Sequence, residues 1–158
     1  MKTLLLGIGN TILGDDGAGV RCVNAVSRLV PPHPDLVIKD TAAAGLNLLD
    51  TILGYDRLIV VDAVLAGEEN IGKVFRLSLA NLQNHTGAVS LHSCGLTAVL
   101  ALGRQLYDMQ VPHEVTIIGI GIRAVDTVTE SLTPPVVAAL PEAIKLVLNA
   151  LPAVNPVS

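Results

Sequence analysis

The chain has 158 residues and a mass of 16.4 kDa, the size of one ordinary globular domain. Its net charge is −4 and its ten Lys and Arg residues are scattered along the sequence, so no nucleic-acid partner is expected. No uninterrupted apolar stretch approaches the about 18 residues of a membrane span. Because hydrophobic residues make up 51% of the chain and aromatic residues only 2%, the core must consist of aliphatic side chains, which suits parallel strands covered by helices.

The first half of the chain alternates strand and helix patterns. Residues 3–9 form an apolar run that predicts a buried strand, and residues 10–17 predict a loop. Apolar residues then recur at helical spacing from Val20 to Val30, where two prolines end the helix. A short strand over residues 36–39, a helix over 46–54 and a buried strand over 57–64 follow.

The second half continues the alternation. Residues 73–79 alternate imperfectly, as in a less buried, antiparallel edge strand. Residues 95–106 predict a helix, 115–122 a buried strand and 134–151 a closing helix that begins with two prolines. This order predicts an α/β fold, a three-layer α/β/α sandwich with a mostly parallel five-stranded sheet and one antiparallel edge strand. We expect a single domain over residues 1–151 and a flexible tail over 152–158.

The loop after the first strand is acidic. Residues 9–14 have the spacing of a phosphate-binding loop, but Asp15 and Asp16 follow where such a loop has Lys and Ser or Thr, so they would repel a phosphate. Ligands of open α/β sheets bind at the carboxyl ends of the strands, where Asp62 also lies near a predicted strand end. These carboxylates would repel one another unless a cation or protons compensated them, which favours a metal site. The alternative is that Asp15 or Asp16 caps the following helix.

His92 could complete a metal site. It lies just before a predicted helix, in a loop that should return to the same sheet edge. Two carboxylate oxygens and one imidazole nitrogen suit zinc, nickel, manganese or iron, and they leave positions for water or substrate. The alternative is an exposed loop histidine.

The two cysteines are Cys22, in a predicted helix, and Cys94. Both are expected to be reduced thiols, which favours the cytoplasm.

Motifs in chain order resemble the hydrogenase maturation endopeptidases. The matching stretches are Leu-Gly-Ile-Gly-Asn at 6–10, Leu-Gly-Asp-Asp-Gly-Ala-Gly-Val at 13–20, Ile-Val-Val-Asp-Ala at 59–63, Ser-Leu-His at 90–92, Gly-Ile-Gly-Ile at 119–122 and Leu-Thr-Pro at 132–134. They span nearly the whole chain. The resemblance implies an endopeptidase that removes the C-terminal extension of a nickel-iron hydrogenase large-subunit precursor after nickel insertion.

The resemblance also implies residue roles. The family's metal-binding and catalytic positions fall on Asp16, Asp62 and His92, and Asp40 matches an acidic position associated with substrate recognition. The expected chemistry is metal-assisted peptide hydrolysis. The expected metal is nickel supplied by the substrate, and zinc or cadmium could occupy the same site. Beyond Asp40, Thr41 and Ala42 replace the family's usual glycines.

Two other functions remain open at this point. A receiver-like phosphoacceptor module also places acidic residues after its first and third strands, but it needs a lysine after a late strand, where this chain has Arg123. A noncatalytic nickel-binding chaperone could use the same ligands without cutting. For the endopeptidase, the expected partner is the precursor, and we expect a monomer.

Overall fold

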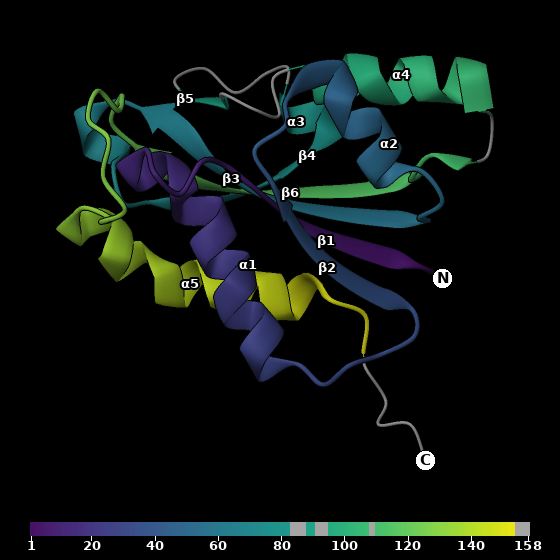
Figure 1. The fold of residues 1–158 in the computed structure, drawn as a ribbon, viewed down its shortest axis with the longest axis horizontal. Coiled ribbons are helices and arrows are strands. Elements are labelled where there is room, and N and C mark those ends of the chain that lie inside the picture. The colour runs from purple at the N-terminus through teal and green to yellow at the C-terminus, as the bar shows by residue number, and fades with distance from the viewer. Residues whose placement is uncertain (83–87, 91–94, 108–109, 154–158) are drawn as a thin grey trace.

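The computed structural model describes residues 1–82, 88–90, 95–107 and 110–153, which form a central sheet between two layers of helices (Figure 1). The strand order is β2-β1-β3-β6-β4. The bounds are β1 (Thr3–Ile8), β2 (Leu36–Thr41), β3 (Arg57–Ala66), β4 (Val74–Ser78) and β6 (Glu114–Ile122). All neighbours on this path are parallel except β4, which pairs antiparallel with β6 at one edge. The predicted three-layer fold, with its mostly parallel five-stranded sheet and antiparallel edge strand, is confirmed.

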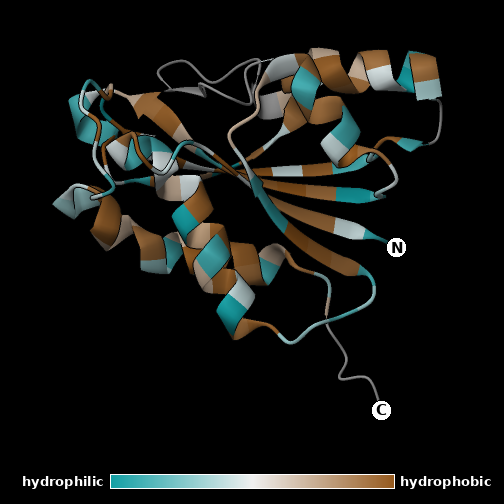
Figure 2. Cartoon of the chain, in the orientation of Figure 1, coloured by the Kyte–Doolittle hydropathy of each residue, from teal (hydrophilic) through white to brown (hydrophobic). Residues whose placement is uncertain are grey.

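Each face of the sheet has its own helices and its own hydrophobic core. The face covered by α1 (Ala18–Leu29) and α5 (Pro134–Ala150) buries Leu5, Ile59 and Val61. The opposite face is covered by η2 (Gly45–Leu48), α2 (Leu49–Ile52) and α4 (Leu96–Tyr107), and it buries Leu58 and Val60. Successive residues of β3 therefore point to opposite layers, as strand geometry requires. The central strands are accordingly hydrophobic over most of their length (Figure 2).

Short elements connect this framework. They are η1 (Gly14–Gly17), η3 (Glu68–Asn70), α3 (Leu79–Leu82) and β5 (Ala88–Ser90), and β5 pairs antiparallel with the end of β3. The sequence patterns predict neither α3 nor β5. Among the described residues, no helix is both long enough and apolar enough to cross a membrane.

Two predicted boundaries differ from the structure. The helix expected over residues 46–54 is divided into η2 and the single turn α2. The strand expected over residues 36–39 extends through Asp40 and Thr41, because these residues pair with Gly7 and Ile8 of β1. Pairing with a neighbouring strand thus overrides the polar local sequence.

Candidate metal centre at the carboxyl edge of the sheet

Asp62 is a fully buried carboxylate in the central strand of the sheet. It has no solvent exposure, and it pairs with Ile8 of β1 on one side and Gly119 of β6 on the other. Since β1 ends at Ile8, Asp62 lies where the carboxyl end of β1 meets β3. Side chains alternate between the two faces along β3, so that of Asp62 lies on the same face as Leu58 and Val60, which α4 covers. Gly119 adds no side chain beside Asp62, and a Cβ there would lie 2.5 Å from Val64 Cγ2.

Asp16 is held in η1, the turn that follows β1. Its carboxylate accepts a hydrogen bond of 2.8 Å from the Asn10 backbone N–H, and the residue is 4% exposed. The chain folds tightly here, since a Cβ on Gly9 would lie 2.1 Å from the Asp16 carbonyl oxygen. Gly9 has a φ of 150°, which an L side chain rarely adopts, so glycine is required on both counts. The placement of Asp16 in a loop after the first strand is confirmed.

Gly19 brings the start of α1 against β3, close to Asp62. A Cβ at this position would lie 2.2 Å from the Val61 carbonyl oxygen and 2.9 Å from that of Ile8. Only glycine allows backbone to approach backbone this closely. The approach places η1, which precedes α1 directly, over the edge of the sheet where Asp62 lies.

The donor set fits a divalent cation. Two buried carboxylates near one sheet edge provide the hard oxygen ligands that such ions prefer, and burial strengthens their attraction for a cation. Within the described ranges, no group of three His, Cys, Asp or Glu side chains converges on one point. The third predicted ligand, His92, lies outside these ranges. On either side of the undescribed residues 91–94, Ser90 pairs with Val64, two residues beyond Asp62, and α4 begins at Leu96.

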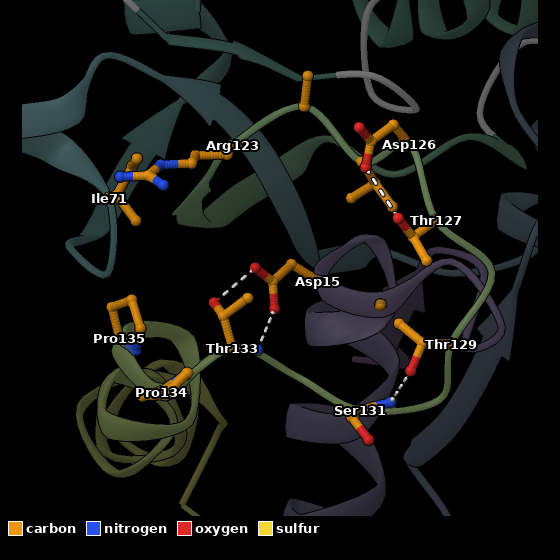
Figure 3. A pocket seen from close by; sticks show the side chains of 13 residues that line it. Asp15, Ile71, Arg123, Asp126, Thr127, Thr129, Ser131, Thr133, Pro134 and Pro135 are labelled. Carbon is orange, nitrogen blue, oxygen red and sulfur yellow. Dashed lines mark hydrogen bonds between the residues drawn. The ribbon is translucent and has the colours of Figure 1, made fainter.

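Asp15 points to different partners from Asp16. Its Oδ1 accepts a hydrogen bond from the Thr133 backbone N–H and its Oδ2 one from the Thr133 hydroxyl, both at 2.7 Å (Figure 3). The alternative that Asp15 or Asp16 caps the following helix α1 does not hold, because the N-cap of α1 is Gly17, without a side-chain bond. Thr133 is instead the N-cap of the distant helix α5. A threonine before Pro134 is a helix-start signal, but nothing local links it to Asp15.

Asp40 is not brought together with Asp62. It lies in β2 rather than in a loop, one register row before the row of Ile8 and Asp62 and two strands away, about 10 Å across the sheet. Its row partners are Gly7 and Val61, so it belongs to the opposite sheet face from Asp62. It is exposed, as a residue that contacts another protein must be.

A cavity of about 430 Å³ lies on the other side of η1, between Asp15, the segment after β6 and the start of α5 (Figure 3). Arg123 lines it and forms an exposed ion pair with Glu68. A receiver needs a late-strand cation that points to its acidic site. Here the cation at that position, Arg123, pairs with Glu68 at the surface instead. The antiparallel strand β4 also departs from the all-parallel sheet of receivers.

Cys22 is part of the core between α1 and the sheet. It has no solvent exposure, and burial raises the pKa of its thiol from 9.0 to about 12. The thiol is therefore protonated at neutral pH and is not a nucleophile. Cys94 lies outside the described residues.

The fold and the site define an α/β protein with an acidic pair at the carboxyl edge of a mixed sheet, and known proteins share this architecture. The sequence profile of the hydrogenase maturation protease family, HycI, matches residues 20–150. The chain is 30% identical to the Hydrogenase 2 maturation protease of Escherichia coli (strain K12) over 154 residues, 96% of this chain and 91% of that protein. It is 33% identical over 152 residues to the hydrogenase expression/formation protein HupD of Thiocapsa roseopersicina, covering 95% and 67%.

Solved structures of hydrogenase maturation proteases share the fold of this chain. The hydrogenase maturating endopeptidase HybD from E. coli superposes with a TM-score of 0.78 at 31% identity, covering 96% of this chain and 92% of that one. The [NiFe] hydrogenase maturation protease HybD from Thermococcus kodakarensis shares the fold, with a TM-score of 0.76 at 22% identity over 95% and 99% of the two chains. The chain belongs to the hydrogenase maturation protease family. The predicted activity, that of a hydrogenase maturation endopeptidase, is confirmed, and the receiver and the noncatalytic chaperone are set aside.

Proposed function

We propose that this endopeptidase removes the C-terminal extension of a nickel-iron hydrogenase large-subunit precursor after nickel insertion, with Asp16, Asp62 and His92 as metal ligands. The observation that carries the proposal is the burial of Asp16 and Asp62, 4% and 0% exposed, at the carboxyl edge of the sheet in a chain of this family. Buried acidic side chains at the edge of an α/β sheet where ligands bind are typical of functional sites.

The residues of the chain have separate tasks in this mechanism. The Asn10 N–H fixes the orientation of the Asp16 carboxylate, and the pairing of β3 with β1 and β6 fixes Asp62 from both sides. When bound, the metal polarises the scissile carbonyl or acidifies a bound water. Asp16, Asp62 and His92 would supply three ligands, and the remaining coordination positions would be available to groups of the precursor.

We also propose that the metal arrives with the substrate. Asp16, Asp62 and His92 would supply only three ligands, so we expect the free protein to bind metal weakly until the precursor supplies the remaining ligands. Nickel is the expected metal, and zinc or cadmium would be a substitute in the same site.

The protein is proposed to act as a monomer in the cytoplasm. Its large exposed hydrophobic side chains come from separate elements on both sides of the sheet, for example Leu29 of α1 and Leu148 of α5 on one side and Leu106 of α4 on the other. Scattered exposed side chains of this kind do not form an obligate interface. Sedimentation should give a mass near 16.4 kDa, and a stable dimer would contradict this.

Incubation with nickel-loaded precursor tests the activity and the ligands together. Wild-type protein should shorten the precursor, whereas Asp62→Asn and His92→Ala should lower the rate by at least about 10³-fold, since each loses a ligand needed in the transition state. Asp50→Asn and His113→Ala remove the same groups at exposed positions and serve as matched controls. Equal activity of His92→Ala and His113→Ala, with circular dichroism unchanged, would remove His92 from the site.

A further inference from the structure

Two neighbouring aspartates in η1 hold opposite sides of the turn. Successive residues of a 3₁₀ helix point about 120° apart, so Asp15 and Asp16 cannot share one task. Asp16 reaches the Asn10 N–H within the loop, while Asp15 reaches Thr133 at the start of α5. The turn is thus anchored to a rigid helix through the residue immediately before the proposed ligand.

The anchor on Asp15 is strong for a single residue. Both carboxylate oxygens accept bonds of 2.7 Å, and Asp15 is only 6% exposed. Hydrogen bonds to a charged group are roughly twice as strong as neutral ones. The carboxylate also lies at the N-terminus of the 17-residue helix α5, where negative charge is favourable.

A second contact joins the same two segments. The Gly14 N–H donates to the Thr129 carbonyl oxygen at 2.7 Å, and the Thr129 N–H donates to the Ile12 carbonyl oxygen at 2.9 Å. The segment between β6 and α5 therefore runs alongside the loop that carries Asp16, and Thr133 fixes its far end (Figure 3).

A plain helix cap does not account for this arrangement. The Thr133 side chain makes no capping bond to α5 and donates its hydroxyl proton to Asp15 instead. The first two residues of α5 are prolines and have no N–H to be capped. The backbone N–H and the hydroxyl of Thr133 thus both donate to Asp15, the residue before Asp16 in η1.

From this geometry we propose that the Asp15–Thr133 pair is a positioning device for the metal ligand Asp16. It holds η1 so that the Asp16 carboxylate is oriented before metal or precursor arrives. The inference rests on the proposed metal site. Neither Asp15 nor Thr133 touches the metal. Partners that orient a metal ligand typically change metal affinity or activity about 10- to 100-fold when they are removed.

Substitutions at Thr133 test the pair without changing a buried residue. Thr133→Val removes the hydroxyl and keeps the shape, and Thr133→Ser restores the hydroxyl. Thr127→Val is the matched control, because it makes the same change at an exposed threonine of the same segment whose hydroxyl donates to exposed Asp126. Affinity for Cd²⁺, measured by calorimetry, should fall about tenfold in Thr133→Val and less than about twofold in the other two variants. Asp15→Asn should have a similar effect to Thr133→Val, and the double variant should lose little more than either.

Hydrogen exchange of the metal-free protein gives a second readout. The Asn10 amide is bonded to the Asp16 carboxylate, so its exchange should accelerate about tenfold in Thr133→Val while the amide of Val60 in the central strand is unchanged. Unchanged exchange at Asn10 would overturn the proposal, and so would equal acceleration at Asn10 and Val60, which would indicate general destabilisation. A rise in KM for the precursor with unchanged Cd²⁺ affinity would also overturn it, because Thr133 would then be a docking residue.

A further variant separates this proposal from the metal site itself. Asp16→Asn should abolish Cd²⁺ binding. If it does not, the assignment of Asp16 as a ligand is wrong, and the exchange at Asn10 still decides whether Asp15 and Thr133 order the turn.

Discussion

The contact between α1 and β3 at Gly19 can be tested with one added methyl group. Gly19→Ala would place a Cβ 2.2 Å from the Val61 carbonyl oxygen, where ordinary contacts begin at 3.4 Å, so the start of α1 must retreat by about 1 Å. Overpacking of this kind costs about 1–3 kcal/mol, while the better helix propensity of alanine returns at most about 1 kcal/mol. With the full propensity gain subtracted, we therefore expect a net loss of up to about 2 kcal/mol in the free energy of unfolding.

The loss of activity should exceed the loss of stability. Because η1 leads directly into α1, the retreat moves Asp16, and a 1 Å misplacement of a catalytic group can cost about 10²-fold in rate. Urea unfolding followed by circular dichroism measures the first effect and precursor processing the second. Asn24→Ala, at an exposed position of the same helix, is the control and should be neutral or slightly stabilising. If Gly19→Ala matches wild type in both assays, the close approach is not required.

Three further predictions concern other parts of the chain. The Cys22 thiol ionises near pH 9.0 when unfolded and near 12 when folded, so its contribution to stability is complete below pH 9 and is lost as pH rises towards 12. The stability difference between wild type and Cys22→Ala should thus be constant below pH 9 and shrink above it by up to about 1.4 kcal/mol per pH unit; a constant difference up to pH 11 would contradict the raised pKa. Asp40→Asn should raise KM for the precursor with little change in kcat or melting temperature, since Asp40 is exposed and far from Asp62; a loss of kcat alone would argue against a recognition role. Nickel-loaded precursor should be cut much faster than nickel-free precursor or a peptide spanning the processing site, and equal rates for all three would show a general peptidase.

The sequence predicts those elements whose signal is local. Continuous apolar runs identify β1, β3 and β6, and helical spacing identifies α1, because burial on both sides leaves a clear pattern. The three residues of β5 have no such pattern, and their pairing with β3 arises only in the folded chain. For the same reason β2 extends over Asp40 and Thr41, whose polar side chains locally favour a loop.

The sequence also predicts only part of the candidate site. The rule that ligands gather at the carboxyl ends of parallel strands points to Asp15, Asp16 and Asp62 together, and the choice of Asp16 as a ligand comes from the family resemblance. It cannot distinguish the task of Asp15 from that of Asp16, because the partner of Asp15 is 118 residues further along the chain. Local capping rules consider only the next turn of the chain, so they offer capping of α1 as the alternative role for Asp15 and do not reach Thr133.

The bond between Asp15 and Thr133 also affects how the protein is made. All three proposed ligands leave the ribosome before Thr133 does, since synthesis runs from the N-terminus at about 5–20 residues per second. The turn that carries Asp16 can fold against β1 early, but it gains its anchor only when α5 has emerged and packed against α1. A contact spanning 118 residues is slow to form by comparison with the local bonds of η1. A nascent or truncated chain that lacks α5 therefore has its ligand residues without the anchor that orders them, and it reaches a competent site only once the last helix is in place.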